Sequence, residues 1–169
     1  MLKISDPVAF SVLAGSGASS VAVDLCTRRI PNVLTFGVAG FGVLIAAFGL
    51  DALTATEAVL GLAVGLALML PGHVIGATGA GDVKLFAALG TLLGPRAMVT
   101  AFIYTAIAGG ALALFVALQR RLLRDTVANA VTLVCTAGAN AGEIERASVN
   151  RFAYAPAIAI GSLAAALGL

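Results

Sequence analysis

Gly76-Ala77-Thr78-Gly79-Ala80-Gly81-Asp82 interrupts a strongly apolar chain and ends on a carboxylate, directly before the apolar segment 83–94. A second carboxylate, Asp24, closes the first apolar segment and precedes Arg28-Arg29-Ile30-Pro31-Asn32. Ionisable groups at the edge of a hydrocarbon layer are costly, so a chain that places two there usually uses them. Two carboxylates that meet suggest acid/base hydrolysis.

The composition predicts an integral membrane protein. Hydrophobic residues make up 60% of the sequence and charged residues 11%, with a mean hydropathy of +1.07. A soluble domain has about 25% charged residues and cannot bury this much apolar surface in a chain of this length. Cys26 and Cys135 form no CxxC pair, so the sequence supports neither a zinc site nor a disulfide framework.

The apolar segments and their breaks predict an all-α polytopic membrane protein with about six transmembrane helices in a single domain, 1–169. The expected spans are 7–23, 31–50, 56–70, 83–94, 97–118 and 152–169. A helix needs about 17–20 residues to cross the hydrocarbon layer, so the third and fourth segments are short. We expect these two to begin inside a protein-lined polar cavity, where a glycine-rich backbone is tolerated.

The basic residues predict that the N-terminus lies outside. With that orientation the inner side holds Arg28, Arg29, Lys84, Arg120, Arg121, Arg124, Arg146 and Arg151, whereas the outer side holds only Lys3 and Arg96. This bias follows the positive-inside rule. Asp24 and Asp82 are therefore expected at the cytoplasmic face of the inner (plasma) membrane.

Residues 126–143 predict a helix lying along the cytoplasmic interface. The polar residues recur at helical spacing, and the remaining positions are mostly apolar. These polar residues are Thr126, Asn129, Thr132, Thr136, Asn140 and Glu143. The apolar core of the segment is too short to cross the membrane.

Each candidate site also has a simpler structural interpretation. Asp24 could form an i,i+4 ion pair with Arg28, and Asp82 could be the N-cap of the following helix. A cap does not require Gly79 and Gly81 in front of it, because such glycines suit a backbone that bends sharply or approaches another group closely.

Two further features have non-catalytic interpretations. His73, the single histidine, has no Cys or Glu at ligand spacing, which favours a solvated loop residue over a metal ligand. Gly61 and Gly65 form a GxxxG pattern that predicts close helix packing.

Three motifs in order resemble the type IV prepilin peptidases, intramembrane aspartic peptidases of the GxGD type. Gly79-Ala80-Gly81-Asp82-Val83-Lys84-Leu85 is similar to the family's GxGDVKL, and Asp24 with Arg28-Arg29-Ile30-Pro31-Asn32 is similar to its first aspartate region. Tyr154-Ala155-Pro156-Ala157-Ile158-Ala159-Ile160-Gly161 resembles Y-G-P-A-I-A-L-G, with Ala155 in place of glycine. The resemblance is to the short form, which lacks an N-terminal domain with CxxC motifs.

The resemblance implies that Asp24 and Asp82 are the catalytic pair and that Gly79, Gly81 and Lys84 shape the site. It also supplies candidate substrate-cavity residues, namely Arg29, Pro31, Asn32, Tyr154 and Pro156. The implied substrate is a prepilin or pseudopilin whose short basic leader is cleaved at the cytoplasmic membrane face. The expected partners are this substrate helix and the lipid bilayer, with a homo-oligomer left open and no nucleic acid.

The chemistry also follows from the residues alone. Two carboxylates that share one proton can hydrolyse a peptide, because one takes a proton from water while the other polarises the carbonyl. No metal or organic cofactor is required. Two alternatives stay open at this point: a small transporter using Asp24 and Asp82 as proton or cation sites, and a membrane scaffold in which both are structural.

Overall fold

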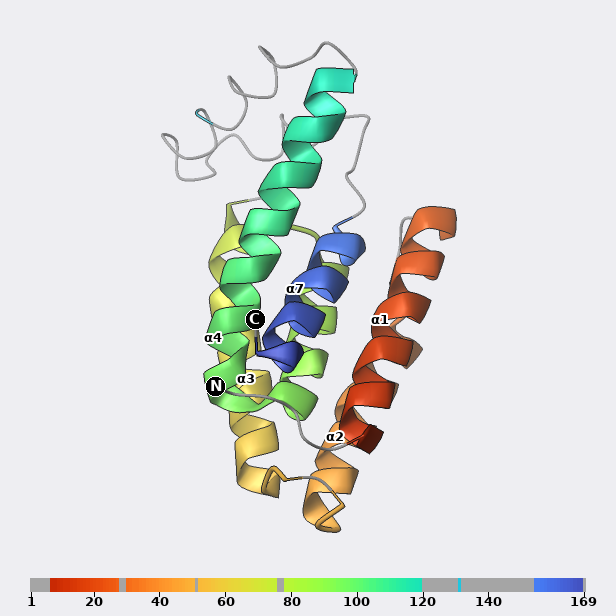
Figure 1. Ribbon diagram of the computed structural model, residues 1–169, viewed down its shortest axis with the longest axis vertical. Helices are drawn as coiled ribbons and strands as arrows, with labels where there is room; N and C mark the ends of the chain where they lie inside the picture. The colour runs from red at the N-terminus through yellow and green to blue at the C-terminus, as the bar shows by residue number, and fades with distance from the viewer. Residues whose placement is uncertain are drawn as a thin grey trace.

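The regular structure of the described residues is entirely helical. The computed structural model describes residues 7–27, 30–50, 52–75, 78–119, 131 and 154–168. Within them lie α1 (Pro7–Thr27), α2 (Asn32–Ala47), α3 (Ala55–Val74), α4 (Ala80–Gln119) and α7 (Ala155–Leu167) (Figure 1). The described parts of all six predicted apolar segments overlap with a helix, so the all-α prediction is confirmed for the described residues. The predicted interfacial helix at 126–143 lies outside the described residues, apart from residue 131.

The element α4 is two helical arms that fold back on each other. Gly94 interrupts it with φ 73° and ψ 170°, and Pro95 follows. The rings of Phe86 and Phe102 lie on opposite sides of this break and meet edge to face, with centroids 6.2 Å apart. A straight helix would separate these residues by about 24 Å at 1.5 Å per residue. The chain therefore reverses at Gly94, where a positive φ suits glycine.

Within the part of the chain that the structure describes, three helices are long and apolar enough to cross a membrane: α1, α3 and α4. The expectation that the third segment is too short is wrong, because α3 extends over 20 residues and includes Pro71 in its last turns. The first arm of α4, residues 80–93, is short as expected and covers about 21 Å. The remaining two helices are also shorter than a usual span, with 16 residues in α2 and 13 in α7.

Small residues allow the helices to approach closely. An added Cβ at Gly61 of α3 would strike the backbone carbonyl of Gly90 in α4, and one at Gly65 would lie 2.7 Å from Met98 and 3.0 Å from Ala87. Both arms of α4 therefore lie against the same face of α3, which confirms the packing role predicted for the GxxxG pattern. Close contact of this kind is the usual basis of helix association where lipid removes the hydrophobic driving force.

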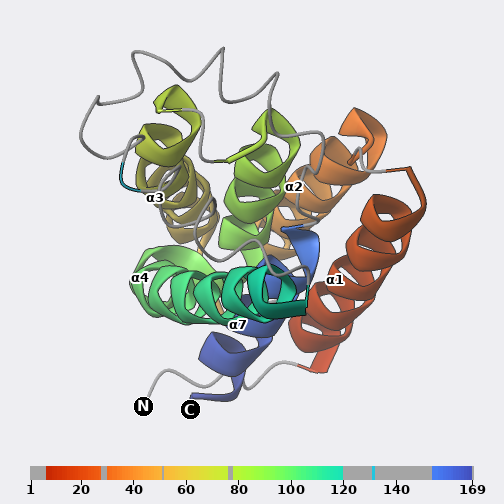
Figure 2. The same cartoon turned by 90° about the horizontal axis from the view of Figure 1, so that it is seen from above.

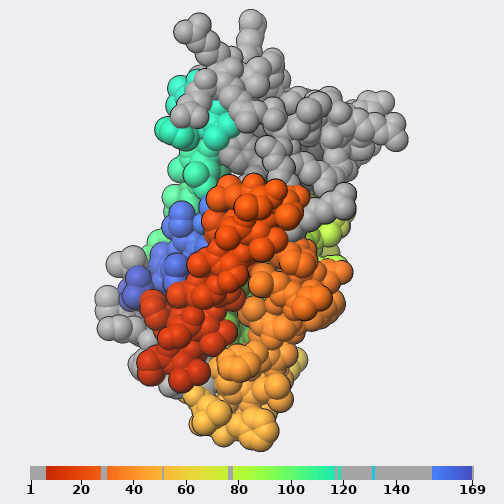
Figure 3. Space-filling view, turned by 90° about the vertical axis from the view of Figure 1, so that its right-hand side faces the viewer, coloured from red at the N-terminus to blue at the C-terminus, as the bar shows by residue number. Residues whose placement is uncertain are grey.

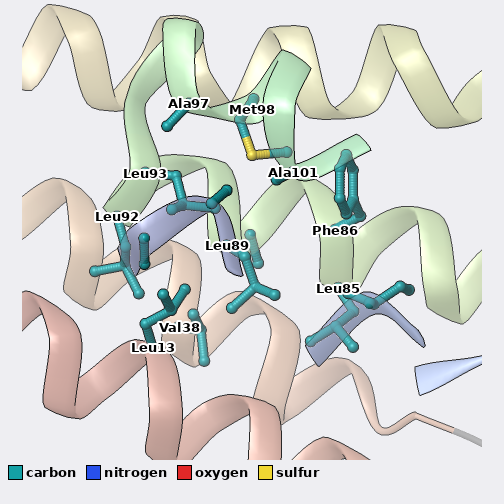
Figure 4. Packing of buried hydrophobic residues seen from close by; sticks show 14 of the residues in the cluster. Leu13, Val38, Leu85, Phe86, Leu89, Leu92, Leu93, Ala97, Met98 and Ala101 are labelled. Atoms are coloured by element: carbon teal, nitrogen blue, oxygen red, sulfur yellow. The ribbon is translucent and has the colours of Figure 1, made fainter. Parts of the chain in front are cut away.

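The first arm of α4 forms the centre of the bundle. Its side chains Leu85, Phe86, Leu89 and Leu92 are almost fully buried. Figure 4 shows them together with Met98 and Ala101 from the second arm, Leu13 from α1 and Val38 from α2. By contrast, α2 exposes 85% of Val33, 68% of Phe36 and 55% of Leu44. Such large apolar side chains at the surface indicate a helix that faces lipid.

Five helix ends lie on the same side of the bundle, and the second arm of α4 extends beyond them. The carboxyl ends of α1 and α3 and the amino ends of α2, α4 and α7 lie towards the top of the bundle in Figure 1, and Figure 2 views this end from above. Figure 3 shows α1 and α2 side by side on one face, with α7 next to α1. Residues that are distant in sequence are thereby brought to a common level.

The Gly61–Gly90 contact gives a first prediction. Gly61→Ala forces α3 away from α4, so it should destabilise the folded protein by about 1–3 kcal/mol, the usual cost of overpacking. Gly40→Ala is the matched control, since a Cβ there meets nothing within 4 Å. Thermal unfolding in detergent measures both, and equal stability of the two variants would contradict the packing described here.

Candidate functional site

Asp24 is a buried carboxylate in the last two turns of α1. Only 6% of its surface is exposed. Its Oδ2 accepts a hydrogen bond from the backbone N–H of Ala155, at 3.3 Å. An unpaired carboxylate at this depth would be costly, so this donor compensates part of its desolvation.

The donor to Asp24 is the amino end of α7. The first N–H groups of a helix lack partners within the helix. In α7, the Tyr154 carbonyl accepts from Ala157 and Ile158, while Pro156 has no N–H to donate. The N–H of Ala155 is thus directed at the carboxylate, and the positive end of the helix dipole faces the same group.

Asp82 lies in the first turn of α4. The Gly79 carbonyl accepts from the N–H of Val83, so the helix begins at Ala80 and Asp82 is its third residue. The interpretation of Asp82 as an N-cap is therefore wrong. Instead, its Oδ2 accepts from the N–H of Gly79 at 3.3 Å. Glu57 occupies the same position in α3, where it accepts from the Thr54 N–H in a complete capping box.

The two glycines of the predicted loop differ in their surroundings. An added Cβ at Gly79 would lie 3.0 Å from Oδ2 of Asp82, whereas one at Gly81 would make an ordinary contact of 3.4 Å with Ile30. Neither glycine is among the described positive-φ residues, which are Gly49, Gly94 and Gly168. The close approach expected of this loop therefore occurs at Gly79.

Asp24 and Asp82 lie close enough for their carboxylates to interact electrostatically. The helix α1 ends near this site, whereas α4 begins there. In the sequence, 57 residues lie between the two aspartates. Tyr154 lies near the same pair. Burial raises the pKa of Tyr154 above its ordinary value, and the negative charge of Asp82 raises it further.

Tyr154 packs on the second arm of α4. An added Cβ at Gly109 would lie 2.5 Å from Cε2 and 2.6 Å from the hydroxyl oxygen of the tyrosine. The ring therefore needs a glycine at this position of α4. Sequence inspection did not identify Gly109 or the Ala155 amide as parts of the site. The only signal for Ala155 was its place in the Tyr154-Ala155-Pro156 motif.

The remaining predicted site residues lie around this pair or outside the described chain. Lys84 is exposed and its Nζ donates to Oδ1 of Asn32 at 3.1 Å, which joins the amino ends of α4 and α2. Pro31 is the exposed N-cap of α2, and Pro156 is half-buried in the first turn of α7. Arg28 and Arg29 lie outside the described residues, so neither the proposed Asp24–Arg28 ion pair nor a cavity role for Arg29 is described.

Comparison with known proteins gives one match. The model of the type IV leader peptidase family matches residues 11–114, which is more than half of the chain and includes both aspartates. Neither the curated proteins nor the solved structures provide a match.

The proximity of Asp82 and Tyr154 gives a second prediction. Removing the charge in Asp82→Asn should lower the pKa of the Tyr154 phenol, because a nearby anion disfavours the phenolate. Absorbance of the phenolate during an alkaline titration in detergent measures this pKa. A Tyr104→Phe background isolates the signal, because the chain has two tyrosines. An unchanged titration midpoint would show that the two groups are not neighbours.

Proposed function

Because the chain belongs to the type IV leader peptidase family, which implies peptidase activity, we propose that Asp24 and Asp82 are the catalytic pair of an intramembrane aspartic endopeptidase. The observation that carries this proposal is the convergence of two carboxylates, one from the end of α1 and one from the start of α4, at one end of an apolar bundle. Each accepts a single backbone N–H among the described contacts. A carboxylate has about four lone-pair sites, so further sites remain for water and substrate.

In the proposed reaction a water molecule lies between the two carboxyl groups. The ionised aspartate removes a proton from this water while the protonated aspartate donates a hydrogen bond to the scissile carbonyl. Attack forms a tetrahedral intermediate, and transfer of a proton to the leaving nitrogen breaks the C–N bond. The products are a new carboxyl end and a new amino end, and the pair returns to its starting state with one proton shared.

The backbone contacts of the two aspartates suit this chemistry. The Ala155 N–H orients Asp24, and the Gly79 N–H orients Asp82, so neither carboxyl depends on a flexible side chain for its position. Preorganisation of this kind lowers the cost of reaching the transition-state geometry. Tyr154 lies beside Asp82 and is a candidate wall of the substrate cavity, together with Pro31, Asn32 and Pro156.

The proposed substrate is the basic leader and apolar helix of a prepilin or pseudopilin. Such a substrate suits a site at the end of a membrane bundle. Its apolar helix stays in lipid while the cleavage point in front of that helix reaches the carboxylates. We place this end at the cytoplasmic face of the inner membrane, with the N-terminus outside and six crossings in total. The bias of basic residues towards the segments flanking α1, α4 and α7 supports this orientation.

The position of the pair favours a peptidase over a transporter. Transporters hold their coupling sites near the middle of the membrane, between structural repeats. Here Asp24 lies in the final turns of α1 and Asp82 in the first turn of α4. A scaffold would not need to bring two repelling carboxylates together.

Amide substitutions give the third prediction. Asp24→Asn and Asp82→Asn should each lower the cleavage rate of a prepilin peptide by at least about 10²-fold, because either change removes the shared-proton arrangement. Cleavage by purified protein in detergent is followed by mass spectrometry of the released leader. Folded yield is measured in parallel and should stay close to that of the wild type, because Asn has nearly the same size as Asp.

Asp51→Asn is the control for this experiment. Asp51 falls between α2 and α3 in the sequence and should be dispensable for cleavage. Substantial cleavage by either catalytic-site variant, or an equal loss in the Asp51 variant, would refute the assignment of the pair.

A further inference from the structure

The peptide group between Thr78 and Gly79 is held at both of its ends. Its N–H donates to Oδ2 of Asp82 at 3.3 Å, and its carbonyl oxygen lies 3.1 Å from Nδ1 of His73. A peptide group is planar, so its N–H and C=O cannot turn independently. Any change at the carbonyl end therefore changes the direction of the N–H that Asp82 accepts.

The carbonyl partner determines which nitrogen of His73 carries a proton. A carbonyl oxygen only accepts hydrogen bonds, so Nδ1 must be the donor. The neutral ring meets this requirement with its proton on Nδ1, and the doubly protonated ring meets it as well. The contact is therefore kept when the histidine changes its charge.

The last turn of α3 is shaped to receive this loop. The Thr78 N–H donates to the carbonyl of Gly72 at 3.2 Å. An added Cβ at Gly72 would lie 3.3 Å from the Thr78 side chain, so a larger residue would push the loop away. Gly72 and His73 thus hold both sides of Thr78, which fixes the peptide group that follows it.

We propose that His73 is a positioning residue for Asp82, acting through the Thr78–Gly79 peptide group. Its hydrogen bond orients this group and polarises it, which strengthens the N–H as a donor to the carboxylate. His73 itself need not touch the substrate. The catalytic consequence rests on the proposed peptidase function, whereas the hydrogen-bond chain is a property of the folded protein alone.

Three variants separate this role from a general stabilising role at the end of α3. His73→Leu removes the donor and should lower kcat roughly 3- to 10-fold, the order expected for one neutral hydrogen bond, with little change in KM. His73→Asn places its Nδ2 donor near the position of Nδ1 and should stay within about twofold of the wild type. His73→Gln carries its donor one carbon further out and should resemble the leucine variant.

The kinetic outcomes are decisive as a set. Wild-type kcat in the leucine variant would overturn the proposal. An equal loss in the leucine and asparagine variants would also overturn it, because the ring rather than the hydrogen bond would then matter. Folded yield and thermal stability are measured for each variant, so that a loss of folded protein is not counted as a loss of kcat.

A second measurement does not depend on cleavage. His73 is the single histidine, so ¹⁵N-histidine labelling in detergent gives one ring to observe by NMR. At a pH where the ring is neutral, the proposal requires the proton on Nδ1, and a proton on Nε2 overturns it. The amide proton of Gly79 should also shift in His73→Leu and much less in His73→Asn. If the wild type fails to cleave prepilin, the proposed function fails while this measurement still decides the role of His73.

Discussion

The hydrogen bond from the Ala155 N–H to the Asp24 carboxylate joins the first described helix to the last one. A carboxylate that is 94% buried needs a donor, and the surrounding side chains of α1 are mainly small or apolar. The amino end of α7 supplies that donor together with the positive end of its dipole. This requirement fixes the height of α7 along the bundle. Once α7 is placed, Gly161 meets Thr105 of α4 and Tyr154 lies over Gly109.

The second carboxylate depends on the packing of α4 against α3. The helix α3 ends at the level where α1 finishes, so Asp82 in the first turn of α4 lies at that end of the bundle. The turn at Gly94 then folds the second arm back against α3. Glycine contacts such as Gly61 with Gly90 make this compact arrangement possible, because they let backbones approach without side chains between them. The site is thus assembled from helix ends that close packing brings to one level. Charged groups at helix ends can be held by backbone N–H groups that the helices leave free.

Hydropathy and motif order predicted much of this arrangement. The apolar segments predicted the helices, the break at Pro95-Arg96 separated the fourth segment from the fifth, and the two motifs identified Asp24 and Asp82. The length of α3 was underestimated because Pro71 and the polar His73 follow its apolar run, yet the helix continues to Val74. Local contacts of Gly72 and His73 with Thr78 in the following loop accompany a last turn that composition alone does not favour.

The backbone donors could not be predicted in this way. The Ala155 amide has no side-chain signature, and its partner lies 131 residues away. In the sequence, nothing distinguishes Gly109 from the other glycines, and its role becomes visible only from the ring of Tyr154 that packs against it. Gly79 and Gly81 looked equivalent in the sequence, and only the position of Asp82 within the first turn of α4 distinguishes them. Side-chain type thus predicted the candidate acids, whereas the groups that orient them depend on how distant helices pack.

We propose that Asp24 and Asp82 face each other at one end of the bundle. Asp24→Cys and Asp82→Cys, in a background with Cys26 and Cys135 replaced by Ser, can be joined in membranes by a short bifunctional thiol reagent. Mass spectrometry of the linked peptides measures the yield, and Asp24→Cys with Thr56→Cys, in the first turn of α3, is the distant control pair. We expect efficient linkage of the aspartate positions and none of the control pair. The proposal would be contradicted if the aspartate positions were not linked, or were linked no more than the control pair, although both thiols react with a monofunctional reagent.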